Sequence, residues 1–311
     1  MNTKIEWCGE TINPIQDTRK GKSGRGYHCT KCSPGCENCY AERINKIRGN
    51  GLPFDDSPVE FELIQSELDK LSRWRKGRSV FVQSMGDLFH PAVSQSIIDE
   101  IFDAFWHHPQ HTHLILTKRP ADMNNYLCTL PEEVGLMPNL YRGLTVSTQR
   151  EWDEKGPIFM QIPGRKFISH EPALETIDFH LSGKQSDVIW RRVHGGSYER
   201  SFLAGIIAGG ETGAGARPSH PNIFRSDRNQ CEAAGVPFFF KSWGEWGPVT
   251  YYAAKSCDHP TLPTHMTDNV DVVALKDSDF KDWYTKMGRI TKKLSGRLLD
   301  GREHNGLPWR I

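Results

Sequence analysis

The chain has 311 residues, 37% of them hydrophobic, which is enough for one large domain or two ordinary ones with a substantial core. Its 39 lysines and arginines nearly balance its 38 aspartates and glutamates, so overall charge does not indicate a nucleic-acid partner. No apolar run is long enough to cross a bilayer, and segment 1–10 has no apolar signal core. We therefore expect a cytoplasmic protein without a membrane partner.

Short β-rich runs recur along the chain, and each is followed by a plausible helix. After a possible first strand at 5–7, the runs are 79–87, 112–120, 140–148, 165–172, 203–212 and 236–245. The expected helices include 94–108 and 221–235, of which the second stops at a glycine. About seven βα units predict an α/β fold with a parallel (β/α) barrel, complete or partial, and an open sheet is the alternative.

We expect this barrel to form one domain over residues 1–246. From 247 to about 286 the alternation of strands and helices breaks down into a segment rich in polar residues and prolines. We interpret 247–311 as an insertion or lid followed by a C-terminal segment, both packed on the same domain.

The stretch 28–42 reads HCTKCSPGCENCYAE and holds four of the eight cysteines: Cys29, Cys32, Cys36 and Cys39. In a reducing compartment, such a group serves metal binding or catalysis more often than disulfides. Structural zinc sites usually use two knuckles that are well separated in the sequence, and no second knuckle lies nearby. Three thiolates on one tight loop suit a cubane iron–sulfur cluster in which one iron has no protein ligand.

The spacing C-x3-C-x2-C followed by an aromatic residue resembles the signature of the radical SAM (S-adenosylmethionine) superfamily. Six blocks are also similar, in the same order, to a phage and bacterial family of radical-SAM-like proteins with the signature C-x6-C-x2-C-Y-A and S-P-G before the second cysteine. The blocks are 29–42, 80–91, 116–120, 209–221, 236–246 and 296–308. That family usually lacks a cysteine at position 32 and favours Cys29 as the first ligand, whereas the superfamily spacing favours Cys32. The basic lead-in 19–28 is longer than usual, and is either a solvated loop or a contact to a phosphate backbone.

The resemblance implies a 4Fe-4S cluster bound through Cys36, Cys39 and either Cys29 or Cys32, with S-adenosylmethionine on the open iron. An electron from the cluster would cleave the sulfonium and give a 5′-deoxyadenosyl radical, which removes a hydrogen atom from an unactivated carbon. The implied partners are DNA or a modified nucleotide, with phage DNA base modification as the suggested role, and an electron donor such as a flavodoxin or ferredoxin.

Parallel barrels gather reactive groups at the carboxyl ends of their strands, and here every predicted strand end carries a charged or hydroxyl group. Candidates for holding the cofactor's amino and carboxylate groups are Ser84, Asp87, Lys118, Arg119 and Glu211, with Ser84 and Asp87 preferred. The predicted cofactor site also includes Tyr40, Thr145, Ser147, Gly209 and Gly210.

Lys241 and Glu171 are the candidate catalytic residues. Lys241 ends an otherwise apolar strand, where its charge would be costly to bury without a partner. His170 and Glu171 are adjacent on a strand, so at most one of them faces the mouth of the barrel unless a bulge intervenes.

Two other classes of protein are alternatives. One is a nucleic-acid-binding protein whose four-cysteine loop holds a structural zinc ion. The other is an electron-transfer protein whose cluster does not act on S-adenosylmethionine. The metal content and the fate of S-adenosylmethionine after reduction distinguish the three.

Overall fold

The computed structural model describes residues 3, 5–21, 24–181, 189–192, 198–248, 271–276 and 284–309. Its centre is a parallel sheet of seven strands in the order β1-β5-β6-β7-β8-β10-β11. These strands are β1 (Glu10–Ile12), β5 (Ser79–Val82), β6 (Thr112–Thr117), β7 (Leu140–Thr145), β8 (Arg165–His170), β10 (Tyr198–Gly209) and β11 (Phe238–Ser242). The short β9 (Ile189–Arg192) pairs in antiparallel fashion with the start of β10.

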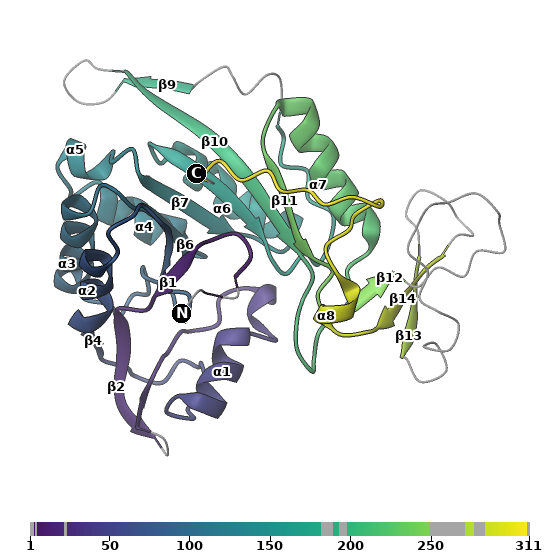
Figure 1. Ribbon diagram of the computed structural model, residues 1–311, viewed down its shortest axis with the longest axis horizontal. Coiled ribbons are helices and arrows are strands. Elements are labelled where there is room, and N and C mark those ends of the chain that lie inside the picture. Colours follow the sequence, from purple (N-terminus) through teal and green to yellow (C-terminus); the bar gives the residue numbers. More distant parts are fainter. Residues whose placement is uncertain are drawn as a thin grey trace.

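The seven strands curve into a half-barrel (Figure 1). Its edges are β1 and β11, which do not pair with each other within the described residues. The predicted α/β class is confirmed, and of the two forms of barrel that the sequence allowed, the partial one is present.

Apolar side chains fill the base of the concave face. Trp7 and Trp309 pack there in one cluster with the strand residues Phe81, Leu114, Tyr141, Phe167, Ala204, Ile207 and Phe239. Trp309 Nε1 donates a hydrogen bond to the Trp7 carbonyl at 2.7 Å, which joins the two ends of the described chain. The predicted strand at 5–7 is therefore wrong: the first strand is β1, and Trp7 contributes to this core.

Helices cover the convex face of the sheet (Figure 1): α2 (Gln65–Arg73), α3 (Gln95–His107), α4 (Pro120–Leu127), α5 (Glu132–Gly135), α6 (Gln149–Gln161) and α7 (Pro221–Ala234). The apolar side of α3 is buried through Ile98, Ile101 and Phe105, which have helical spacing. α7 has proline in its first turn and ends at Gly235, whose φ of 68° is left-handed. Both predicted helices, 94–108 and 221–235, are confirmed.

The basic lead-in 19–28 is largely part of a small sheet formed by β2 (Ile15–Gly21), β3 (Gly24–Gly26) and β4 (Phe61–Leu63). The Arg19 guanidinium is bound to Asp17 at 2.8 Å and also contacts His28 Nδ1 at 2.8 Å. The described residues of the lead-in thus lie largely in the antiparallel strands β2 and β3, next to the cysteine loop.

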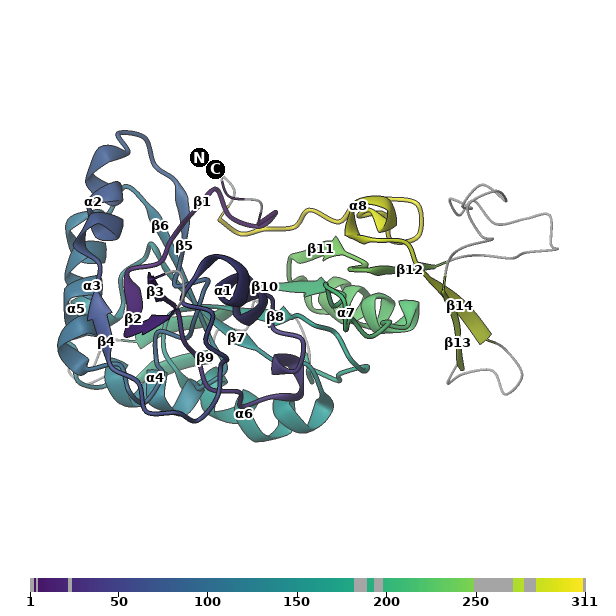
Figure 2. The same ribbon diagram turned by 90° about the horizontal axis from the view of Figure 1, so that it is seen from below.

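A second small sheet contains β12 (Trp246–Pro248), β13 (Val272–Lys276) and β14 (Tyr284–Arg289), and it projects from the half-barrel (Figure 2). Most of the predicted lid, 249–270 and 277–283, lies outside the described residues. After α8 (Lys292–Ser295), the C-terminal segment returns to β11. There Phe240 N donates to His304 O at 3.0 Å, and Gly306 N donates to Phe238 O at 2.9 Å.

Candidate functional site

The cysteine loop lies at the carboxyl ends of the central strands. It contains the 3-10 turn η1 (Pro34–Cys36), and α1 (Tyr40–Arg48) begins directly after Cys39. A Cβ atom at Gly35 would lie 2.3 Å from Ser147 Oγ and 3.0 Å from Pro172 Cδ. Because these two residues follow β7 and β8, the backbone of the loop packs directly on the mouth of the half-barrel.

This close approach makes Gly35 a sensitive position. We expect Gly35→Ala to lower the free energy of unfolding by about 2 kcal/mol, because the added methyl group overpacks the contact, and to reduce metal loading of the loop. Adding Ser147→Ala should restore part of both, since it removes the oxygen that the methyl group meets. Chemical denaturation and metal analysis measure the two effects.

Gly135→Ala is the control, because its Cβ would come no nearer than 3.9 Å to another residue. Equal losses in Gly35→Ala and Gly135→Ala would contradict the proposed docking of the loop.

Glu211 anchors the cysteine loop from the end of β10. Its carboxylate accepts hydrogen bonds from Arg217 Nε at 2.9 Å, Arg217 Nη2 at 2.6 Å and Asn38 Nδ2 at 3.0 Å. Arg217 also donates to the Pro34 carbonyl at 3.0 Å and pairs with Glu37 at 2.8 Å. Both oxygens of Glu211, a predicted cofactor residue, are therefore engaged in holding the loop in place.

The four thiols of the loop are all free of disulfides. Cys29 and Cys39 are half-buried and pack beside Met85, whereas Cys32 is exposed. Burial raises the pKa of Cys29 to about 12. A hydrogen bond from Cys32 lowers the pKa of Cys36. Among the described residues, no three Cys, His, Asp or Glu side chains are already arranged to enclose a metal ion.

Two cations face these thiols from the end of β6. Lys118 lies on the same, concave side of the sheet as Leu114 and Leu116. Burial lowers the pKa of Lys118, but the nearby Cys36 and other cysteines raise it more, so the net shift of the pKa is upward. Arg119 Nη1 lies 3.9 Å from Cys29 Sγ. Soft thiolates offset by fixed positive charge suit an iron–sulfur cluster, so the residues present fit that group.

Asp87 is buried behind these cations and is fully hydrogen-bonded. It accepts from Thr117 Oγ1 at 2.7 and 2.9 Å, from Lys118 N at 3.1 Å and from Phe89 N at 3.0 Å, and it pairs with Arg119 at 3.2 Å. This predicted cofactor residue thus joins the ends of β5 and β6.

Ser84 and Tyr40 close the same side of the mouth. Ser84 Oγ donates to Asn13 Oδ1 at 3.1 Å, and the Tyr40 hydroxyl donates to the Ser84 carbonyl at 2.5 Å. Burial of this hydroxyl, together with Cys39 and Glu171 nearby, raises the pKa of Tyr40, although the residue as a whole is 39% exposed. The structure therefore brings Tyr40, Ser84 and the loop together.

The two predicted catalytic residues form an ion pair on the concave face. Lys241 Nζ lies 2.7 Å from Glu171 Oε1, and Ser169 Oγ donates to the other carboxylate oxygen at 3.3 Å. A Cβ atom at Gly209 would lie 2.8 Å from Glu171 Oε1, so this glycine makes room for the pair. Burial lowers the pKa of Lys241, but Glu171 raises it more, and the net shift is upward.

Neighbouring residues divide between the two faces of the sheet. His170 Nδ1 lies 2.8 Å from Asp227 Oδ2 of α7, with both side chains fully buried, so His170 is on the helix side and Glu171 faces the mouth. Thr145 and Ser147 are buried at the end of β7, and Ser147 Oγ has no hydrogen-bond partner among the described residues. A Cβ atom at Gly210 would lie 1.9 Å from the Trp243 carbonyl, so the chain's own backbone requires this glycine.

Sequence reasoning missed Asn13 and Asn38. Asn13 Oδ1 accepts from Ser84 Oγ at 3.1 Å and from Met85 N at 2.9 Å, which joins β1 to the end of β5. Its position directly after β1 could have indicated this role, but the first strand was expected at 5–7 instead of Glu10–Ile12. Asn38 lies between two cysteines of the signature, and its amide reaches Glu211.

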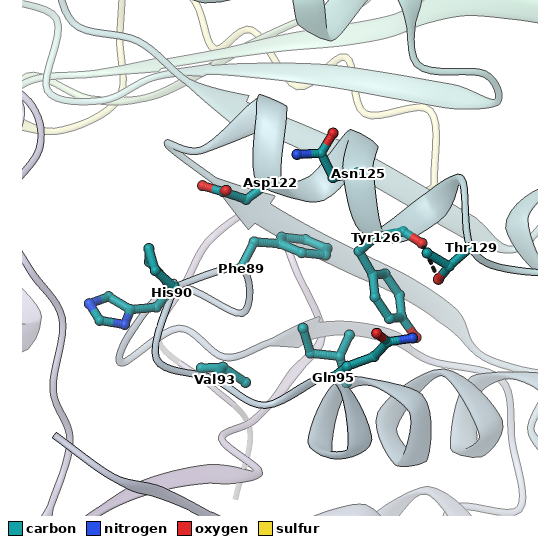
Figure 3. Close-up of a pocket in the computed structure, with 10 residues that line it drawn as sticks. Phe89, His90, Val93, Gln95, Asp122, Asn125, Tyr126 and Thr129 are labelled. Atoms are coloured by element: carbon teal, nitrogen blue, oxygen red, sulfur yellow. Dashed lines mark hydrogen bonds between the residues drawn. The ribbon is translucent and has the colours of Figure 1, made fainter.

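A separate cavity of about 320 Å³ lies between α4 and the segment that leads into α3 (Figure 3). Its lining residues are Phe89, His90, Pro91, Val93, Gln95, Ile98, Asp122, Asn125, Tyr126 and Thr129. None of them is a predicted site residue. His90 connects this cavity to the cysteine loop, because its Nε2 lies 2.7 Å from Thr30 Oγ1.

The fold and site define an α/β protein with a partial parallel barrel and a four-cysteine loop at its mouth. Residues 2–308 match the family described as "Protein of unknown function (DUF5131)", and the chain belongs to that family. No curated protein and no solved structure matches the chain. In the part of the chain that the structure describes, every helix is too short or too polar to span a membrane.

Proposed function

We propose that this protein is a radical S-adenosylmethionine enzyme that binds a 4Fe-4S cluster through Cys29, Cys36 and Cys39. The observation that carries the proposal is the position of the cysteine loop, which packs through Gly35 on the carboxyl ends of a parallel half-barrel. Parallel α/β barrels hold their reactive groups at that end. The loop therefore lies where a bound cofactor and a substrate could meet.

The surroundings of the thiols support Cys29 over Cys32 as the first ligand. Cys29 packs with Cys39 beside Met85 and has a guanidinium next to its sulfur, whereas Cys32 is exposed. Shielding from solvent and hydrogen bonds to sulfur are two of the protein's means of controlling such a cluster. Cys32 is then an additional thiol that donates a hydrogen bond to the proposed ligand Cys36.

The other residues at the mouth would position the cofactor and substrate. Lys118 offers positive charge beside the cysteines, and Ser84 offers a hydroxyl near the start of α1. The Lys241–Glu171 pair places a cation and a carboxylate over Gly209. When bound, the cluster would supply the electron that cleaves the sulfonium of S-adenosylmethionine and yields the 5′-deoxyadenosyl radical.

A nucleobase or modified nucleotide in DNA is the proposed substrate class, with a flavodoxin or ferredoxin as electron donor. The sequence resemblance supports both. Lys20, Arg25 and Lys31 are exposed near the loop, and although Arg25 pairs with Glu62 and Lys31 with Glu42, such surface pairs can exchange for a phosphate backbone.

Anaerobic purification and reconstitution test the proposed function. The expected result is a brown protein with iron and sulfide in near-equal amounts that forms 5′-deoxyadenosine from S-adenosylmethionine after reduction. A colourless protein with one zinc ion would support the structural-zinc alternative. Intact S-adenosylmethionine after reduction of a bound cluster would support electron transfer instead.

A further inference from the structure

Arg119 is held in a fixed position at the sulfur of Cys29. Its Nη1 lies 3.9 Å from Cys29 Sγ and 3.2 Å from Asp87 Oδ2, and its Nη2 donates to the Thr30 carbonyl at 2.9 Å. The side chain is 10% exposed and that of Asp87 is 7% exposed. The guanidinium is thus bound on several sides and directed at the cysteine loop.

The carboxylate that holds Arg119 is itself immobile. Thr117 Oγ1 donates to both oxygens of Asp87, and the backbone amides of Phe89 and Lys118 donate one hydrogen bond each. Thr117 Oγ1 also accepts from the backbone amide of Arg119 at 2.9 Å. An anion and a cation are therefore fixed side by side near Cys29, with the guanidinium in contact with its sulfur.

We propose that Arg119 and Asp87 are positioning residues that set the reduction potential of the cluster in opposite directions. This inference rests on the proposed function and on Cys29 as a ligand. Reduction adds one negative charge to the cluster, so a fixed cation at a ligand sulfur stabilises the reduced form and raises the potential. The Asp87 carboxylate weakens that effect because its charge is of opposite sign.

Two variants that break the same ion pair separate this electrostatic role from a structural one. In Arg119→Gln the Asp87 carboxylate loses its cationic partner, and the reduction potential of the cluster is expected to fall. In Asp87→Asn the Arg119 guanidinium loses its anionic partner, and the reduction potential of the cluster is expected to rise. For each variant we expect at least a tenfold change in the equilibrium constant for reduction, which corresponds to about 59 mV for a one-electron couple. A merely structural role would shift the two reduction potentials in the same direction or leave both unchanged.

The measurement is a redox titration of the reconstituted protein followed by electron paramagnetic resonance. Arg225→Gln is the control: Arg225 of α7 pairs with Asp300 at 2.8 Å, a contact that includes no residue of the cysteine loop, and the potential of this variant should equal that of the wild type. Arg119→Lys keeps the charge and should shift less than Arg119→Gln. Shifts of equal sign in Arg119→Gln and Asp87→Asn, or no shift in either, would overturn the inference.

Failure of the inference is distinguishable from failure of the proposed function. If the wild-type protein binds no iron–sulfur cluster, the proposed function fails before any titration. If either variant cannot hold a cluster, Thr117→Val is measured instead, because it removes the hydroxyl that donates to both oxygens of Asp87. With its carboxylate less well neutralised, this variant should have a lower potential, and an unchanged or higher one would contradict the inference.

Discussion

Alanine in place of Cys29, Cys36 or Cys39 is expected to abolish most of the iron binding of the protein, whereas Cys32→Ala is expected to retain it. Each of the first three removes one thiolate of the proposed three-ligand set, and a cluster with two protein ligands would be poorly held. Cys32 is exposed and is not one of the proposed ligands. Iron and sulfide analysis after anaerobic reconstitution, with the visible absorption spectrum, measures the difference.

The four cysteine variants also discriminate between the candidate functions. A structural zinc site of four thiolates would lose its metal in all four variants, Cys32→Ala included. Loss of iron in Cys32→Ala with retention in Cys29→Ala would show instead that the C-x3-C-x2-C spacing supplies the ligands. Cys231→Ala, which removes a buried thiol of α7, controls for general loss of folding.

Lys241→Met is expected to lower the free energy of unfolding by about 3 kcal/mol, because it leaves the Glu171 carboxylate largely buried without its partner. The two side chains are 22% and 15% exposed, so water compensates little for the lost contact. The double variant Lys241→Met, Glu171→Gln should be less destabilised than the sum of the single variants, with a coupling energy of about 2 kcal/mol. Denaturant unfolding of the metal-free wild type, the two single variants and the double variant gives the free energies of this double-mutant cycle.

The same pair has an expected catalytic effect. In reconstituted Lys241→Met, cluster content should be unchanged while the rate of 5′-deoxyadenosine formation falls by about 100-fold, because small displacements of bound groups cost that much.

The exposed pair Arg150–Glu154 of α6 is the control for the stability measurement, and Arg150→Met should change the free energy of unfolding by less than about 0.5 kcal/mol. Additive single variants would show that Lys241 and Glu171 act independently.

The parts of the fold that could be predicted from sequence are those set by local pattern. Four of the β-rich runs, 79–87, 112–120, 140–148 and 165–172, begin at the residue where a strand begins, and the periodicity of 94–108 identified α3, because both depend on side chains near in sequence. The first strand was expected at 5–7, where Ile5 and Trp7 alternate with Glu6, whereas it lies at Glu10–Ile12. An apolar residue stands at position 7 because Trp7 packs in the core on the concave face of the half-barrel, not because the segment is a strand.

The sequence singled out residues that the structure brings to one end of the half-barrel, but it indicated few of the contacts between them. The alternation of β8 correctly separated His170 from Glu171, and the need of Lys241 for a partner followed from its burial. That the partner is Glu171 depends on β8, β10 and β11 lying side by side, which no local pattern contains. The hydrogen bond from Asn38 to Glu211 could not be predicted either, because the two residues are 173 positions apart in the sequence.

The hydrogen bond between the indole of Trp309 and the carbonyl of Trp7 spans 302 positions. The base of the concave face is therefore incomplete until synthesis of the chain has passed Trp309, however early the strands have paired. A nascent chain must keep the apolar base of its half-barrel open for most of its translation, and contacts this distant in sequence close slowly. Chaperones that shield apolar surfaces would have their clearest target in this chain at the floor of the half-barrel.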